Sequence, residues 1–474
     1  MMNQDEFNII TYAPLLILSV TSILVMFIEA VVKKSEKISY AMSIIGLVAT
    51  FILSLRTINL SGTTLQEMLN VGGMGSLFTG LFSIMAIGTI VLAKEFLEKE
   101  NAHYGEFYLL ILFATIGMVL MATAADLIVI FLGLELMSIC LYVLAGFMRK
   151  RILSNESALK YFIMGAFASG FLLYGIALIY GASGTTKIAF IFNNYETISK
   201  SPFFWVGTGF LFVALAFKVG AVPFHMWVPD VYQGAPTPVS AFMSTGAKAA
   251  AFAAVIILFL TSDISRGKDL TNIIIVVSSL SMIVGNILAI SQSNLKRMLA
   301  YSSIAHAGYI LVGIVANNQI GRNGVIFYVC SYAFMNLGAF GILSLLEKEE
   351  TNLTYDDYSG LAKRKPAIAA FMSIFMFSLA GIPPFAGFFG KYYVFVSAID
   401  AGYTWLAILG VLMSLVSIYY YLKLVVVMYF QEGISEPTPG ISIGSYLVII
   451  LSMAAVTVLG IFPNSLLFII TAFK

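Results

Sequence analysis

The chain has 474 residues, of which 60% are hydrophobic and only 11% are charged, and its net charge is +2. A soluble globular protein is nearer half apolar and one quarter charged, so most of this surface must face lipid. The near-neutral charge gives no electrostatic argument for binding nucleic acid. Long continuous apolar runs indicate membrane-spanning helices rather than a closed β-barrel, whose strands would alternate in hydrophobicity.

The sequence lacks the motifs that bind common cofactors. It has no HExxH zinc spacing, no GxGxxG or P-loop after a strand, and no CxxCH haem site. Its two cysteines, Cys140 and Cys330, stand far apart within apolar runs, so we interpret them as core residues. The chain alone therefore offers no visible site for a nucleotide, haem, metal or iron–sulfur cluster.

In chain order, apolar runs of about 20 residues predict an all-α polytopic membrane protein with about fourteen transmembrane helices. The first is expected to be an uncleaved anchor, because no signal-peptide pattern precedes it. An even number of helices places both termini on the same side of the membrane. The predicted helices span about 9–32, 38–55, 75–93, 106–124, 127–148, 158–180, 202–220, 238–260, 270–290, 299–316, 324–346, 366–389, 404–430 and 441–472.

The basic residues between these helices predict the orientation, because cytoplasmic loops carry an excess of Lys and Arg. If both termini are periplasmic, the cytoplasmic loops hold fifteen basic residues and the opposite loops hold seven. This asymmetry of about two to one predicts a multi-pass protein of the cell inner membrane with both termini in the periplasm.

Four of the 26 basic residues fall inside the apolar segments instead, namely Lys218, Lys248, Lys391 and Lys423. A lysine at the centre of a spanning helix costs about 2.5–3.5 kcal/mol on insertion scales, so each one needs a partner, water or a route to the interface. Lys423 lies near the cytoplasmic end of its helix and can extend to the interface. Lys248 lies among small residues in STGAKAAAF, where a static ion pair is the structural alternative to a functional role.

Two of these lysines adjoin breaks in their helices. GAVP (220–223) follows Lys218 in helix 7, and GIPPFAGFFG (381–390) precedes Lys391 in helix 12. In transporters, broken helices in corresponding positions of two repeats mark the ion path. The five-helix spacing therefore predicts that helices 4–8 and helices 9–13 are two inverted repeats. The corresponding division of this single membrane domain is 1–100, 101–265, 266–432 and 433–474.

Glu135, in FLGLELMSIC, is the acidic residue set deepest within an apolar helix, and Lys218 is its expected partner. A paired buried lysine stays charged, whereas separating the pair favours release of its proton, so this constellation predicts a proton relay. His306, in SSIAHAGYI, could pass a proton between Lys248 and Lys391. The structural alternatives are a static clamp between Glu135 and Lys218 and a hydrogen-bonded core histidine.

Three long motifs resemble a known family of membrane subunits. They are VPFHMWVPDVYQGAPTPVSAFMSTGAKAAAF (222–252), QSNLKRMLAYSSIAHAGYILVG (292–313) and FSLAGIPPFAGFFGKYYVF (377–395). They look like the antiporter-like membrane subunits of respiratory NADH:quinone oxidoreductase, which is complex I. The DVYQGAP and LAGIPPFAGFFGK stretches and the chain length are most similar to the subunit N (NuoN) family. The resemblance covers the chain from about helix 4 to helix 13.

This resemblance implies fourteen helices with inverted five-helix repeats, broken helices 7 and 12, and a hydrated axis of charged residues. It implies a Glu on helix 5 and Lys on helices 7, 8 and 12, which match Glu135, Lys218, Lys248 and Lys391. It also implies proton translocation driven by electron transfer from NADH to quinone, with FMN, iron–sulfur clusters and quinone on partner subunits. The chain ends at Lys474 without the lateral amphipathic helix of the longest family member, which favours subunit N over the distal subunit.

Other functions fit parts of the same pattern. A subunit of a multisubunit sodium/proton antiporter, or of a membrane-bound hydrogenase, would share the fold and the buried lysines. A non-pumping scaffold would tolerate neutralisation of each buried charge, and a freestanding enzyme lacks a nucleophile–base constellation. We expect a translocase subunit whose partners are the other membrane subunits and lipid, with a proton relay of Glu135, Lys218, Lys248, His306, Lys391 and Lys423.

Overall fold

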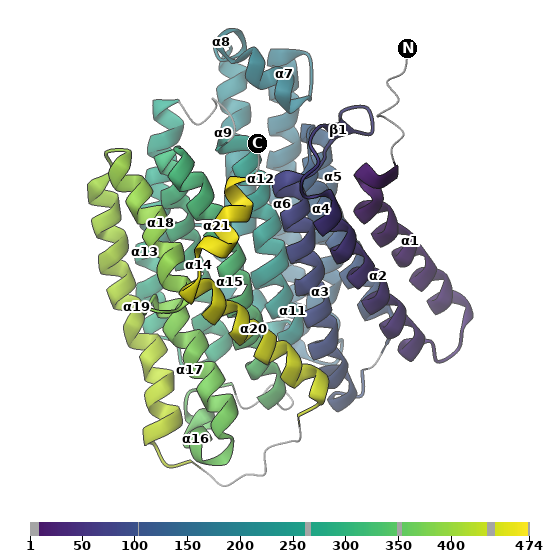
Figure 1. The fold of residues 1–474 in the computed structure, drawn as a ribbon, viewed down its shortest axis with the longest axis vertical. Coiled ribbons are helices and arrows are strands. Elements are labelled where there is room, and N and C mark those ends of the chain that lie inside the picture. The colour runs from purple at the N-terminus through teal and green to yellow at the C-terminus, as the bar shows by residue number, and fades with distance from the viewer. Residues whose placement is uncertain (1–8, 103, 261–266, 348–352, 434–440, 473–474) are drawn as a thin grey trace.

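The computed structural model describes residues 9–102, 104–260, 267–347, 353–433 and 441–472. In these ranges the chain forms a bundle of helices with one short hairpin, in which β1 (Thr63–Thr64) and β2 (Leu69–Asn70) pair antiparallel. Figure 1 shows the long helices running between two ends of the bundle, with α7 and α8 at the upper end and α16 at the lower end. The all-α class predicted from the apolar runs is confirmed.

Helices make up both halves of the described chain. The first half contains α1 (Ile9–Val31), α2 (Glu36–Thr57), α3 (Gly73–Lys99), α4 (Glu106–Thr123), α5 (Leu127–Ala145), α6 (Ile152–Ser183), α7 (Ile188–Asn193), α8 (Tyr195–Ile198), α9 (Pro202–Val219), α10 (Trp227–Gly234), α11 (Thr237–Phe242), the π-helix η2 (Met243–Ala247) and α12 (Lys248–Phe259). The second half contains α13 (Lys268–Ile290), α14 (Leu295–Ala316), α15 (Gln319–Leu346), the 3₁₀-helix η4 (Asp356–Tyr358), α16 (Leu361–Arg364), α17 (Pro366–Ala380), α18 (Ala386–Asp400), α19 (Thr404–Phe430), α20 (Ile443–Ile461) and α21 (Asn464–Thr471).

Thirteen helices of the described residues are long and apolar enough to cross a membrane, counting α11, η2 and α12 as one. Their positions follow the predicted spans to within a few residues at most ends. The one predicted span that is not among these thirteen is helix 12, at about 366–389. It consists of two shorter helices, α17 and α18, which are separated at 381–385. The predicted end at 389 is wrong because α18 continues through the polar Lys391 to Asp400, beyond the point where a simple apolar run stops.

Both predicted helix breaks are present. α9 ends at Val219, where Gly220 adopts a φ of 73°, and the short helix α10 begins only at Trp227. α17 ends in the same way at Ala380, and Gly381 adopts a φ of 87°. Each break interrupts the fourth helix of its predicted group of five. The predicted boundary between the two groups, at 265/266, lies outside the described residues.

Several other helix ends differ from their predicted positions. α3 continues to Lys99 rather than about 93, and α15 begins at Gln319 rather than about 324. α6 begins at Ile152 rather than at about 158, because its first turns are polar and were counted as loop. The predicted last helix, 441–472, is divided into α20 and α21 at Pro463, which has no backbone N–H to continue a helix.

The centre of the bundle is formed by the helices that carry the middle of the sequence. Every residue from Thr237 to Phe259 is buried, and α14 and α15 are buried along nearly their whole lengths. The helices α1, α2, α19 and α20 lie at the periphery with much of their apolar surface exposed. Figure 1 shows α20 slanting across one face of the bundle. Apolar helices that are exposed in this way need lipid or other membrane subunits around them.

Ion pairs join several helix ends at one end of the bundle. Arg151, at the start of α6, lies 2.6 Å from Glu100, which follows α3, and 3.1 Å from Glu347, which follows α15. From the distribution of basic residues, all three helix ends are predicted to lie on one side of the membrane, the cytoplasmic side. The structure therefore agrees with the predicted alternation of helix directions.

Candidate functional site

Three of the predicted lysines have their ammonium groups inside the bundle. These lysines are only 5%, 3% and 4% exposed, in the order Lys218, Lys248 and Lys391. Each lies next to an irregular helix segment: the end of α9, the π-helix η2, or the gap between α17 and α18. Irregular backbone frees polar groups and space that a continuous helix would occupy.

Lys218, in the last turn of α9, is held by side chains of α5 and α6. Its Nζ donates hydrogen bonds to Ser138 Oγ at 2.7 Å and to Tyr142 Oη at 3.2 Å. The ammonium also lies 5.3 Å from the ring centroid of Tyr142 and 5.4 Å from that of Tyr161. Aromatic faces attract a cation through their quadrupoles. The hydroxyls and aromatic rings that contact this ammonium are all uncharged.

Glu135 does not form the expected direct ion pair with Lys218. Within the described residues, these two groups are not among the charged pairs within 4.0 Å, and Glu135 instead accepts a hydrogen bond from Ser169 of α6. Ser138 lies one turn after Glu135 on α5 and occupies the position next to the ammonium that we expected the carboxylate to occupy. The described residues therefore show no direct contact between Glu135 and Lys218, and the expected action of this carboxylate on the lysine stays a prediction.

Lys248 directly follows the five-residue π-helix η2. Its Nζ donates to the carbonyl oxygen of Ser303 at 2.8 Å and to Ser303 Oγ at 2.7 Å, and it lies 5.8 Å from the ring centroid of Tyr332. No carboxylate of the described residues forms an ion pair with it. The static ion pair considered for Lys248 is therefore absent from the described part of the chain.

His306 lies one turn after Ser303 on α14 and is enclosed by tyrosines. Its Nδ1 lies 2.9 Å from Tyr328 Oη, and its Nε2 lies 3.1 Å from Tyr421 Oη, which is also hydrogen-bonded to Ser302. A hydroxyl group can donate or accept, so both nitrogens keep a partner in either tautomer and in the imidazolium form. The expected histidine is thus hydrogen-bonded in a way that suits either a core residue or a proton carrier.

Lys391, in the first turns of α18, occupies the gap in the broken helix. Its Nζ donates to the carbonyl oxygens of Leu379 and Ala380 at 3.1 and 2.9 Å, and to Ser414 Oγ at 2.7 Å. These carbonyls belong to the last turn of α17, where unpaired acceptors and the helix dipole favour a cation. The face of the Tyr309 ring lies 5.0 Å from the same ammonium. The helix break therefore creates the binding position for this lysine.

Lys423 differs from the other three. It is partly exposed on α19 and lies 4.3 Å from the ring centroid of Tyr355. It shares no hydrogen-bond or ring partner with Lys391 in the described parts of the chain. The structure therefore does not bring Lys423 into the buried group.

One face of α14 links the later part of the predicted relay. Ser303 contacts Lys248, His306 comes three residues later, and Tyr309 comes three residues after that and faces Lys391. Lys218 and Lys248 have no hydrogen-bond or ring partner in common among the described residues.

The hydroxyl and aromatic partners of the lysines were not predicted from the sequence. The three-residue spacing on α14, and Ser138 one turn after Glu135, were the available signals.

A polar pocket with a volume of about 150 Å³ lies at the end of α10 and is lined partly by Asp230 and Arg297. Asp230 is bound at 2.7 Å by both Lys160 of α6 and Arg297 of α14. Burial raises the pKa of the Asp230 carboxyl, but the hydrogen bonds and charges of Lys160 and Arg297 outweigh burial and lower the pKa below its ordinary value. This ion-pair cluster fixes α10 against helices from both groups of five, and sequence analysis did not single out Asp230.

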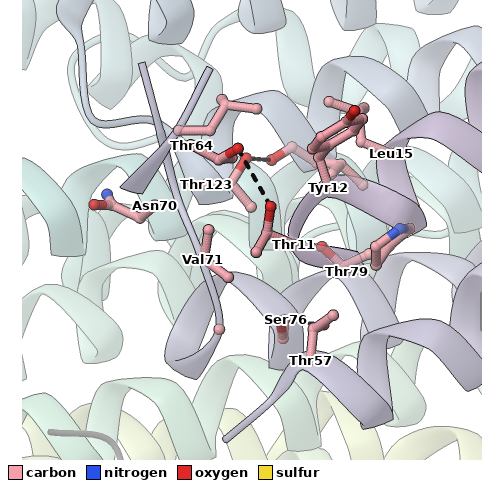
Figure 2. Close-up of a pocket in the computed structure, with 14 residues that line it drawn as sticks. Thr11, Tyr12, Leu15, Thr57, Thr64, Asn70, Val71, Ser76, Thr79 and Thr123 are labelled. Carbon is pink, nitrogen blue, oxygen red and sulfur yellow. Dashed lines mark hydrogen bonds between the residues drawn. The ribbon is translucent and has the colours of Figure 1, made fainter. Parts of the chain in front are cut away.

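A smaller polar pocket lies apart from the lysines, between α1, the β1–β2 hairpin and α3. It has a volume of about 30 Å³, close to the space of one or two water molecules, and is rich in threonine. Figure 2 shows Thr11, Thr64 and Thr123 near one another at its upper side, and Thr57 and Ser76 below. Thr11 donates to Thr64 at 3.3 Å, and Thr57 and Ser76 are hydrogen-bonded at 2.8 Å. None of the predicted site residues lines this pocket.

Comparison with known proteins places the chain in a family. Residues 124–417 match the family of transmembrane proteins described as NADH:quinone oxidoreductase/Mrp antiporter. The NADH-quinone oxidoreductase subunit N of Trichlorobacter lovleyi is 44% identical over 465 residues, which cover 97% of this chain and 96% of the relative.

Solved structures show the same fold. A chain of respiratory complex I from Thermus thermophilus with bound aureothin superposes with a TM-score of 0.85 at 33% identity, over 97% of this chain and all of that chain. A chain of the Mrp complex from Dietzia sp. DQ12-45-1b superposes with a TM-score of 0.86 over 98% of this chain and 97% of that chain, but at only 20% identity. The chain therefore belongs to the subunit N family of NADH-quinone oxidoreductases, the membrane subunits of complex I that share their fold with antiporter subunits.

Proposed function

We propose that the chain translocates protons across the cell inner membrane through a relay of Glu135, Lys218, Lys248, His306 and Lys391, with Lys423 at its end. Electron transfer from NADH to quinone in partner subunits would drive this transport. The observation that carries the proposal is the shared environment of the three buried lysines. Hydroxyl groups, backbone carbonyls and aromatic rings hold each ammonium, and none of the three forms an ion pair with a carboxylate of the described residues.

This environment suits reversible protonation. A buried ammonium that is paired with a carboxylate is held in its charged form, because deprotonation would leave the carboxylate unpaired. An ammonium held by neutral groups can gain or lose its proton in response to a charge that moves nearby. Glu135, one turn from Ser138, is in our proposal the charge that acts on Lys218.

The proposal also covers the surroundings of the subunit. FMN, the iron–sulfur clusters and the quinone site would lie on partner subunits, and neighbouring antiporter-like subunits would cover part of the exposed apolar surface. Both termini would lie in the periplasm, since the end of the bundle that holds Arg151 and its partners belongs to the side with fifteen basic residues. The names of the relatives support membership of such a complex.

Replacing Lys248 tests the relay. We expect Lys248→Ala to lower NADH-driven proton transport by about tenfold or more, because a proton-transfer group would be lost. The measurement compares acidification of inverted membrane vesicles with the amount of assembled complex on native gels. Lys187→Ala is the matched control, because Lys187 is an exposed lysine paired with Glu67. Unchanged proton transport at normal assembly would instead favour a scaffold role.

Purification of the tagged chain distinguishes a subunit of complex I from the remaining alternative, a subunit of a sodium/proton antiporter. We expect it to co-purify with NADH:quinone reductase activity and with flavin and iron–sulfur spectra. A particle that contains only membrane subunits would place the chain in a sodium/proton antiporter.

A further inference from the structure

Asn286, on α13, is a fully buried polar residue that the proposed relay does not include. Its side-chain amide is hydrogen-bonded on both sides to tyrosines. The Nδ2 atom donates to Tyr309 Oη of α14 at 2.9 Å and to the Met282 carbonyl at 2.7 Å. The Oδ1 atom accepts from Tyr420 Oη of α19 at 2.9 Å. A single amide therefore fixes two buried tyrosines from two different helices.

Tyr309 stands between two residues of the proposed relay. The face of its ring lies 5.0 Å from Lys391 Nζ, and its ring is 5.6 Å from that of His306 at an interplanar angle of 88°. A cation–π contact depends on the ring presenting its face to the charge. Asn286 holds the hydroxyl at the far end of this ring and thereby fixes which way the face points.

Tyr420 is linked to His306 through its neighbour Tyr421. Its ring lies 4.4 Å from that of the adjacent Tyr421, and the hydroxyl of Tyr421 is 3.1 Å from His306 Nε2. Rotation of Tyr420 would displace Tyr421, because both side chains are fully buried and tightly packed. Asn286 is thus separated from Lys391 by one residue, Tyr309, and on this second route from His306 by two, Tyr420 and Tyr421.

We infer that Asn286 is a positioning residue of the proton path, which holds Tyr309 against Lys391 and, through Tyr420, holds Tyr421 against His306. This inference rests on the proposed function, since it assigns Asn286 a task only if these two residues carry protons. A static link between helices would require only one of the two hydrogen bonds. Here one bond leads to Tyr309, which contacts both Lys391 and His306. The other leads to Tyr420, which packs against the Tyr421 that is hydrogen-bonded to His306.

Asn286→Leu, which keeps the size of the side chain and removes its polar atoms, is the first test. In assembled complex reconstituted into vesicles, we expect fewer protons transported per NADH oxidised. We also expect the pH profile of this ratio to move to lower pH by about half a unit, because Lys391 loses an oriented cation–π partner. Ser278→Ala is the matched control on the same helix, since Ser278 Oγ donates only to the Gly308 carbonyl, at 2.8 Å.

Tyr309→Phe is the second variant, which keeps the ring and removes the hydroxyl that Asn286 holds. We expect it to shift the pH profile in the same direction, and we expect the double variant to add little to Asn286→Leu, because the two changes break the same bond. If Asn286→Leu prevents assembly, Tyr309→Phe decides, and an unchanged pH profile for it overturns the inference. A loss of assembled complex alone, with the transport ratio and pH profile of the parent, would make Asn286 a static link.

Lys391→Ala, measured in the same vesicles, separates the inference from the proposed function. Normal transport by Lys391→Ala would refute the relay itself. Loss of transport in Lys391→Ala together with parental behaviour of Asn286→Leu and Tyr309→Phe would refute only the role of Asn286.

Discussion

Serine hydroxyls take the place of carboxylates beside the buried lysines. Each buried ammonium donates a hydrogen bond of 2.7 Å to one serine hydroxyl, that of Ser138, Ser303 or Ser414. The backbone carbonyl of Ser303 also accepts a hydrogen bond, at 2.8 Å. A hydrogen bond to a charged group is worth about 1.5–3 kcal/mol, enough to fix a side chain without adding a charge. These residues were not predictable individually, because serine is common in spanning helices and most of its hydroxyls bond to the backbone of their own helix.

Removing one such hydroxyl should weaken the site more than it weakens the fold. We expect Ser138→Ala to lower proton transport by about tenfold, because Lys218 keeps only the longer bond to Tyr142. The measurement is acidification of inverted vesicles per assembled complex. Ser22→Ala is the control, since Ser22 Oγ bonds only to the Leu18 carbonyl in its own helix. Equal transport by both variants would show that Ser138 has no role in the site.

At the scale of helices, the breaks were the most predictable part of the site. The motifs GAVP and GIPPF correctly marked the ends of α9 and α17, because glycine adopts positive φ and proline cannot continue a helix. What the sequence did not show is how the pieces meet. The carbonyls that bind Lys391 are free acceptors because α17 ends there, but Lys391 reaches them only through the tertiary contact between α17 and α18.

Gly381 offers a test of this contact. Its φ is 87°, and an added Cβ would lie 3.0 Å from Lys391 Cδ. Gly381→Ala should therefore cost about 1–2 kcal/mol for the backbone and in addition displace Lys391, lowering proton transport. Gly402→Ala is a close control, since Gly402 has a φ of 85° and nothing within 4 Å of an added Cβ. The comparison uses thermal unfolding and vesicle acidification. Equal transport by the two variants would contradict the proposed contact.

For the whole molecule, composition and charge predicted the membrane class, the number of helices and their alternating directions. The contact of Ser138, rather than Glu135, with Lys218 was not predicted, because apolar patterning places a residue in a helix but does not fix how that helix is rotated toward its neighbours. The cluster of Asp230, Lys160 and Arg297 was missed for a related reason. These charges lie near helix ends, where charged residues are usually solvated and give no signal of a contact.

Asp230 connects α6, α10 and α14, so the stability of the whole bundle should fall when acid protonates this carboxylate. The pKa of Asp230 in the folded protein lies below its ordinary value of 3.8. Its contribution is therefore complete above about pH 4 and is lost as the pH falls through the lower, folded-state pKa. We expect the melting temperature of the purified protein to fall less steeply with acid in Asp230→Asn than in the parent.

Asp400→Asn serves as the control for this comparison, because Asp400 accepts a hydrogen bond from Asn318 at the opposite end of α18 from the relay. If the melting temperature of Asp230→Asn falls with acid as steeply as that of the parent, the ionisation of Asp230 does not contribute to the stability of the bundle.

The placement of the three lysines at interior helix breaks has an electrical consequence. A charge that crosses the whole membrane does work of about 2.3 kcal/mol for every 100 mV of potential. If the buried lysines lie at the same depth in the membrane, a proton that passes sideways between them crosses almost none of that potential. The steps among the buried lysines would then be insensitive to voltage, and nearly all the work against the membrane potential would be done where protons enter and leave the bundle.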